Sequence, residues 1–247
     1  MKNSILVLQF FALISVGYAQ SVVPNNIRAA NTLDRLVDLD GLSNADMLYG
    51  IPLPEGKVIG DTYLDAQWKA ASILLYDKNK LIEGFPVRYD IHLNELEIKA
   101  KNGVKVLKGD KVKSFVWIDS LTNSPTYFVN AKEFKNEDNV TLTGFFQVLI
   151  DGSLPLFKKT KVDVKKANYN VQLNVGSLDD KILKKDELYV VKGHQVIELP
   201  SSKKKLLPFF GDKSEDIEKF IKENALTTNK EYHLTTIFKH YNSLVNN

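Results

Sequence analysis

The sequence predicts a mainly β protein, an antiparallel meander that forms an open barrel or sandwich and is capped by two or three C-terminal α-helices. From about residue 62 to residue 199, apolar and polar residues alternate with period 2. Turn-forming residues interrupt this alternation at short intervals, as in antiparallel sheets. After residue 201 the apolar residues take helical spacing, so we expect the helices to follow the sheet.

The first residues indicate a secretory signal peptide. Lys2 supplies a basic start, residues 5–16 are almost all apolar, and Gly17 and Ala19 place small residues before the expected cleavage site. The apolar run is shorter than the roughly 20 residues that span a bilayer. We therefore expect export to the periplasm or out of the cell, and no lipid anchor, because the cleavage site lacks cysteine.

Composition narrows the class of protein further. The chain has no cysteine, which excludes disulfides, a thiol nucleophile and a thiolate metal site. The formal net charge falls from +3 to +2 when the leader, with Lys2 as its one charged residue, is removed. This charge is too small for a nucleic-acid partner. After residue 16 no apolar stretch has membrane length, so only peripheral membrane contact is expected.

The expected organisation has four parts. They are a signal peptide (1–19), a partly disordered lead-in (20–59), an antiparallel β domain (60–200) and a helical segment packed on it (201–247). The lead-in contains an acidic loop around Asp38 and Asp40, whose oxygens suit calcium. Its spacing fails the EF-hand pattern, and a solvated linker is the favoured interpretation.

The clearest unit of the β domain is a hairpin formed by residues 85–91 and 96–99, with Leu93-Asn94 at its turn. The expected pairs are Ile91 with Leu96, Asp90 with Glu97, and Tyr89 with Ile98. The turn lacks glycine, so a longer loop is also possible. Further strands are expected at 72–76, 104–107, 113–118, 126–131, 141–151, 154–164, 187–192 and 195–199.

Two of these strands carry more specific expectations. Residues 115–118 are apolar on both faces, which indicates a central strand covered on each side. Val162 and Val164 alternate with charged residues, so we expect them on a buried face. Hairpin turns are expected at Asp151-Gly152 and Gly193-His194.

Three helices are expected at the end of the chain. A short one covers residues 203–207, before Pro208 and Gly211. A capping box of Asp212 and Glu215 begins the second, and Asn229 caps the last.

Several segments resemble a recurrent pattern in exported Bacteroidota proteins of unknown function. The segments are Gly60–Leu64, Val87–Ile91, Leu96–Ile98, Gly144–Leu149, Leu188–Lys192, Lys203–Leu207, Ile217–Asn224 and Tyr241–Leu244. The resemblance implies export and a single unit of sheet plus helices. It implies no activity and no site residues.

The best candidate site is the polar face of the hairpin, with Arg88, Asp90, His92, Glu95 and Glu97. A pair of carboxylates there could act as general acid and base, or bind a cation together with His92. The simpler interpretation, which we favour, is that Arg88 bridges carboxylates on a solvated face, because strand alternation alone produces such faces.

The remaining sequence offers no catalytic motif, no cofactor signature and no metal site. His233 and His240 lie seven apart, whereas a helical metal pair needs a spacing of four. No nucleophile elbow or phosphate-binding loop is present. Lysine runs such as Lys158-Lys159 could attract an anionic membrane or glycan, but solvated faces are favoured.

We therefore expect a non-catalytic envelope protein that acts as a binding or accessory module. It could hold a protein partner, or a lipophilic ligand lined by Phe145, Phe146 or Trp117. We favour the interpretation that these aromatic residues belong to a closed hydrophobic core and do not line a cavity. The alternatives are a hydrolase that uses the polar hairpin face and a structural subunit of a surface assembly.

Overall fold

The computed structural model describes residues 55–119, 122–170 and 173–245. Residues Gly56–Asn247 form one compact unit. The signal peptide and the acidic loop lie outside the described residues, so the expectations about them stay predictions. None of the described helices is both long enough and apolar enough to cross a membrane.

One mixed sheet of eleven strands dominates the compact unit, and it does not close. The strands are β1 (Val58–Ile59), β2 (Lys69–Leu75), β3 (Leu81–Asp90), β4 (Glu95–Ala100), β5 (Gly103–Lys108), β6 (Val112–Ile118), β7 (Pro125–Asn130), β8 (Phe145–Ile150), β9 (Leu156–Lys165), β10 (Asp180–Lys192) and β11 (Gln195–Glu198). Their spatial order is β1-β10-β9-β8-β7-β6-β2-β3-β4-β5, with β11 on β10. The predicted class, mainly β and open with C-terminal helices, is confirmed.

Short 3-10 turns and the C-terminal helices complete the fold. These elements are η2 (Asp77–Asn79), η3 (Gly109–Lys111), η4 (Ala131–Glu133), α3 (Lys203–Leu206), η5 (Leu207–Lys213), α4 (Ser214–Glu223) and α5 (Glu231–Val245). The predicted capping box is wrong, because the N-cap of α4 is Lys213 and makes no side-chain cap bond. Instead, the Ser214 hydroxyl donates to the carbonyls of Leu207 and Gly211.

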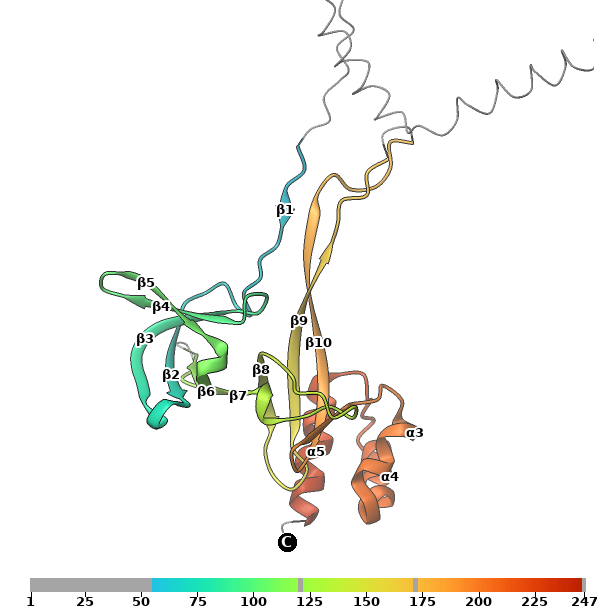
Figure 1. The fold of residues 1–247 in the computed structure, drawn as a ribbon. Coiled ribbons are helices and arrows are strands. Elements are labelled where there is room, and N and C mark those ends of the chain that lie inside the picture. The colour runs from blue at the N-terminus through green and yellow to red at the C-terminus, as the bar shows by residue number, and fades with distance from the viewer. Residues whose placement is uncertain (1–54, 120–121, 171–172, 246–247) are drawn as a thin grey trace, which may run out of the picture. The chain divides into compact units, whose positions relative to one another are not determined.

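Strands β9 and β10 form a ribbon that extends beyond the end of β8 (Figure 1). The pairing of β8 with β9 ends at Gln147 and Lys158. In the described part of the chain, residues 159–165 of β9 pair with β10 alone. One backbone edge of this seven-residue stretch is therefore free.

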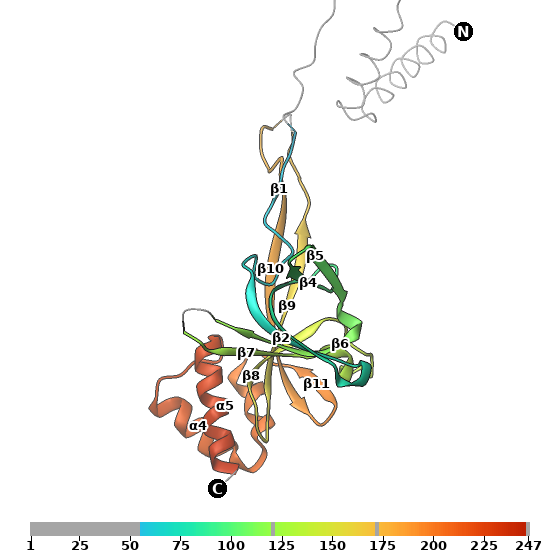
Figure 2. The ribbon, with the colours of Figure 1, turned by 90° about the vertical axis from the view of Figure 1, so that its left-hand side faces the viewer.

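The apolar side chains gather in three clusters on the two faces of the sheet. On β8, Phe145 belongs to the cluster inside the curled strands β2–β7, whereas its neighbour Phe146 points to the opposite face. On β9, Leu156 packs against the helices and Phe157 lies with Phe146. Figure 2 shows α4 and α5 on one side of β8–β10 and β11 on the other.

The register of the β3–β4 hairpin differs from the prediction. Arg88 lies opposite Glu97, and Asp90 lies opposite Glu95. The turn therefore takes four residues, 91–94, and the pairing is shifted by two positions. A shift of two keeps every side chain on its predicted face, because the side-chain period of a strand is two.

Two predictions about covered faces are wrong. In β6, Phe115 and Trp117 are buried, but Val116 and Ile118 are only half-buried, so one face is fully covered. In β9, Val162 is half-buried and Val164 is 37% exposed. These valines lie on the projecting ribbon, where no element of the described chain covers them completely.

Asn242 fixes helix α5 to the turn between β8 and β9. It is buried, and its Oδ1 accepts a hydrogen bond from the Leu154 amide at 2.9 Å. Its Nδ2 lies 3.4 Å from the Leu154 carbonyl oxygen. The amide side chain thus satisfies a buried backbone donor of the β8–β9 turn.

We expect Asn242→Ala to lower the free energy of unfolding by about 2 kcal/mol, because the Leu154 amide loses its acceptor while it stays buried. Urea denaturation measures this difference. The neighbouring Ser243→Ala, at an exposed position, should change stability by less than ~0.5 kcal/mol. Equal effects of the two substitutions would contradict the assigned role.

Candidate functional site

A segment we call the strap, Thr62–Trp68, runs along the edge of β3, where Tyr63 and Asp90 form an antiparallel bridge. The Leu64 amide donates to the Tyr89 carbonyl at 2.8 Å, and the Ile91 amide donates to the Thr62 carbonyl at 2.9 Å. The side chain of Leu64 packs against the cluster inside the curled strands. The strap backbone therefore extends the sheet at the edge of β3, and the Tyr63 side chain covers part of the polar face that strand alternation predicts to be solvated.

Arg88 and Glu97, two of the predicted site residues, hold the strap in place. The Arg88 Nε lies 2.6 Å from a Glu97 carboxylate oxygen, and the Tyr63 hydroxyl donates to the other oxygen at 2.9 Å. The Arg88 guanidinium lies 4.0 Å from the Tyr63 ring centre and 4.6 Å from that of Trp68. One cation thus binds two aromatic rings and a carboxylate.

The other three predicted residues have separate positions. Asp90 is 6% exposed, and it accepts hydrogen bonds from the Thr62 hydroxyl at 2.6 Å and from the Leu93 amide at 2.9 Å. Glu95 is half-buried opposite Asp90, and His92 is exposed in the turn. The structure therefore joins Arg88 to Glu97, while Asp90 holds the turn.

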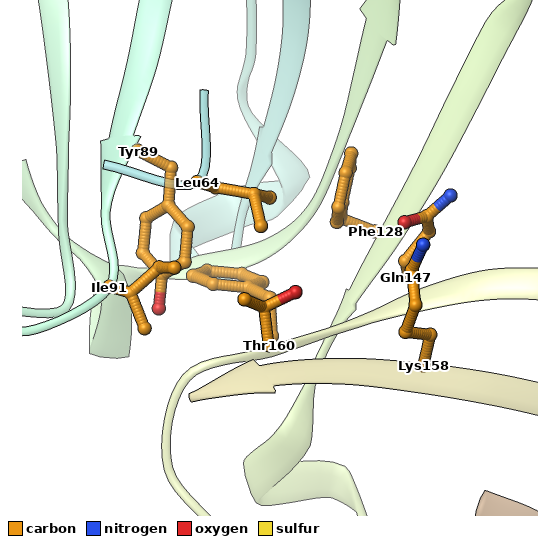
Figure 3. Close-up of a pocket in the computed structure, with 8 residues that line it drawn as sticks. Leu64, Tyr89, Ile91, Phe128, Gln147, Lys158 and Thr160 are labelled. Carbon is orange, nitrogen blue, oxygen red and sulfur yellow. The ribbon is translucent and has the colours of Figure 1, made fainter. Parts of the chain in front are cut away.

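Three hollows form a row along β9, and Thr160 borders each of them. The turn hollow, about 330 Å³, lies between the β3–β4 turn (Ile91, His92, Asn94) and residues 159–162 of β9. A small hollow of about 10 Å³ follows it (Figure 3). Its volume suits no more than a single water molecule.

The strap hollow is the third of the row, and its volume is also about 330 Å³. The strap residue Leu64 and the aromatic rings of Trp117 and Phe128 form one wall. Lys158 and Thr160 of β9 and Lys184 and Asp186 of β10 belong to the other side of its lining. We call the three hollows together the β9 groove.

The aromatic wall of the groove belongs to a closed core. Trp117 is 4% exposed, and the rings of Phe115 and Phe128 stack with their centres 4.4 Å apart. Phe145 and Phe146 are also buried, on opposite faces of β8. The Trp117 indole N–H is buried without a hydrogen-bond partner in the described residues, although such donors are normally paired.

Lys159 has an unusual environment for a lysine. Its Nζ donates to the Thr143 carbonyl at 2.7 Å and lies 5.6 Å from the centre of the Phe146 ring. Burial, together with the nearby charge of Lys161, lowers the pKa of Lys159 to about 8, whereas the Glu187 carboxylate acts in the opposite direction. Lys159, together with Thr143, also lines the turn hollow.

The histidines His194, His233 and His240 do not gather at one place, and each has its own surroundings. The His233 Nδ1 accepts from the Thr227 amide at 3.0 Å, and the His240 ring stacks on Phe220 with 3.8 Å between the ring centres. His194 lies in the β10–β11 turn. Within the described ranges, no group of three or more histidine and acidic side chains is arranged to hold a metal ion.

Sequence patterns alone do not mark Tyr63, Trp68, Lys159 and Thr160 as site residues. Tyr63 was visible only as part of the segment Gly60–Leu64. The run Lys158-Lys159 was interpreted as a solvated face, but Lys159 is half-buried beside Phe146. Its burial depends on where β8 ends, which the lysine run does not indicate.

Comparisons with known proteins add no relative to these observations. No family model, no curated protein and no solved structure matches the chain. The functional interpretation therefore depends on the geometry of the site.

We expect Arg88→Lys to lower the free energy of unfolding by about 1 kcal/mol, because a lysine loses the planar contacts with Tyr63 and Trp68. Hydrogen exchange should also become faster at the Leu64 and Ile91 amides. As a control, Lys105→Arg changes an exposed cation of the neighbouring strand β5 and should leave both quantities unchanged. Unaltered hydrogen exchange in the Arg88→Lys variant would show that the Arg88 contacts do not hold the strap.

We expect the stability difference between wild type and Lys159→Met to depend on pH. The pKa of Lys159 is about 8 in the folded chain and near 10.5 when the side chain is solvated. Between these values the unfolded chain binds more protons, so wild-type stability rises with pH relative to the variant. Urea denaturation of both proteins at pH 7 and pH 10 tests this prediction. The tyrosines titrate in both proteins, so their contribution cancels in the stability difference. A constant difference would show that Lys159 is not desolvated.

Proposed function

We propose that the chain is a non-catalytic binding module of the cell envelope, whose ligand is an extended segment of a partner protein. The segment binds along the β9 groove and adds a strand to the free edge of β9. The observation that carries this proposal is that the turn hollow lies beside residues 159–162 of that free edge. Envelope location follows from the predicted signal peptide and from the resemblance to exported Bacteroidota proteins.

The length of the free edge supports strand addition. Residues 159–165 span about 23 Å at the rise of an extended chain, which is a typical strand length. An added strand gains main-chain hydrogen bonds from the edge and places alternate side chains into neighbouring pockets. The turn hollow supplies such a pocket beside this stretch.

The side chains of the ribbon favour a different protein over a second copy of this chain. Thr160, Val162 and Val164 point to one face of β9, and Lys161, Asp163 and Lys165 to the other. In an antiparallel pair of identical edges centred on Asp163, Lys161 lies opposite Lys165 of the other copy, which is unfavourable. The uncharged face remains available to a partner with complementary side chains.

Exposed apolar side chains on the ribbon give further support. On the uncharged face of β9, Val162 is half-buried and Val164 is 37% exposed. A two-stranded ribbon is only marginally stable in water by itself. A partner strand would cover these side chains and widen the ribbon, so binding would also stabilise it.

The alternative functions have less support from the geometry. The carboxylates of Asp90 and Glu97 are already hydrogen-bonded to Thr62, Leu93, Tyr63 and Arg88, which does not favour a hydrolase at the hairpin face. A lipophilic ligand would find little apolar surface, since Trp117 and Phe145 are buried. Membership of a surface assembly is compatible with strand addition, the partner then being another subunit.

Two adjacent proline substitutions, Val162→Pro and Asp163→Pro, test strand addition. Successive N–H groups of a strand point to opposite edges, so one substitution blocks the free edge and the other breaks the ladder with β10. The probes are peptides selected on the full chain from a random 12-residue display library. We expect the edge-blocking variant to keep its unfolding temperature and to bind these peptides at least about tenfold more weakly.

Hydrogen exchange provides the second readout of the same experiment. Bound peptides should slow exchange of the free-edge amides of residues 159–165. Peptide binding that leaves these amides unchanged and survives both proline substitutions would overturn the proposal. A library that yields no binder above background would also count against it.

A further inference from the structure

The lysines that border the β9 groove differ in their partners. Lys158 pairs with Glu231 at 3.1 Å, Lys161 with Glu187 at 2.6 Å and Lys184 with Asp61 at 2.9 Å. Lys159 contacts a neutral carbonyl, and within the described residues no carboxylate pairs with it. Its positive charge is therefore the least compensated charge of the groove.

The lack of a paired carboxylate matters for Lys159 because this lysine is half-buried. Its ammonium group lies beside the Phe146 ring, where water solvates it poorly. A charged group in such a place is stabilised by an opposite charge at close range. The fold supplies one carboxylate nearby, that of Glu187, but Glu187 already binds Lys161, Lys185 and the Tyr189 hydroxyl.

The turn hollow offers space for an additional anion. It borders Lys159, Lys161 and the exposed His92 of the β3–β4 turn. The Tyr89 hydroxyl, also in the lining, donates to Asn94 and is thereby engaged. A volume of about 330 Å³ accommodates an acidic side chain next to the free edge of β9.

We propose that the turn hollow is a carboxylate subsite, in which Lys159 pairs with an aspartate or glutamate side chain of the segment that binds along β9. This inference rests on the proposed function and names the chemistry of its partner: an extended, acidic peptide. A single carboxylate fits better than a phosphate dianion, because Lys159, Lys161 and Glu187 together carry one net positive charge at neutral pH.

A titration that needs no peptide tests the subsite. The full chain is labelled with ¹³C and ¹⁵N in its lysines, and the Lys159 signals are assigned by their loss in Lys159→Met. Acetate is the probe, and chloride at equal ionic strength is the reference. We expect the Lys159 shifts to saturate with acetate but not with chloride, and acetate to bind roughly tenfold more weakly at pH 9.5 than at pH 7.5.

A matched variant separates specific binding from general charge effects. Lys113→Met removes an exposed lysine of β6 and should leave the acetate response unchanged. Identical Lys159 shifts in acetate and chloride would overturn the inference. Tighter binding of inorganic phosphate than of acetate would overturn the assignment to a carboxylate.

The outcomes for the subsite and for the proposed function are distinguishable. Acetate binding at Lys159, combined with no strand addition in the proline experiment, would refute the proposed function and leave an anion subsite. Peptides that protect the β9 edge but show no acidic residue, together with an absent acetate response, would overturn the subsite alone. If both are right, the selected peptides carry an aspartate or glutamate at one fixed position and lose affinity about tenfold on Lys159→Met.

Discussion

The fold depends on three strands that must bury apolar side chains on both of their faces. Phe145 and Phe146 of β8 point in opposite directions, as do Leu156 and Phe157 of β9 and Tyr189 and Val190 of β10. Because side chains alternate along a strand, each of these pairs demands cover on each side of the sheet. The helices and the curled strands β2–β7 cover one face, and β11 with the segment around Phe134 covers the other.

The groove is located where this two-sided cover ends. Strand β8 stops pairing at Gln147, but β9 continues to Lys165. Lys159 follows the last paired residue, so one side of its stem lies against Phe146 while the other borders the turn hollow. The lowered pKa of Lys159 and the free backbone edge therefore have the same origin, which is the different lengths of β8 and β9.

The sequence was sufficient to predict the class of fold and which face each side chain of the main hairpin occupies. It failed on the pairing, because the conformation of the turn decides the register: Asn94 adopts a positive φ of 54°, and Asp90 accepts the Leu93 amide. The Arg88–Glu97 pair follows from that register. The strap was also unpredictable, since the segment is too short for a clear pattern and its position depends on Arg88 and Glu97, which lie far along the chain.

The attachment of α5 has a consequence for the order in which the chain folds. The buried residues Ile150, Leu156 and Val190 are covered by helices that come later in the chain, and Asn242 completes the turn of a much earlier hairpin. The core beneath the helices therefore cannot close until nearly the whole polypeptide has been synthesised. Until then, the apolar side chains of this core stay exposed to solvent.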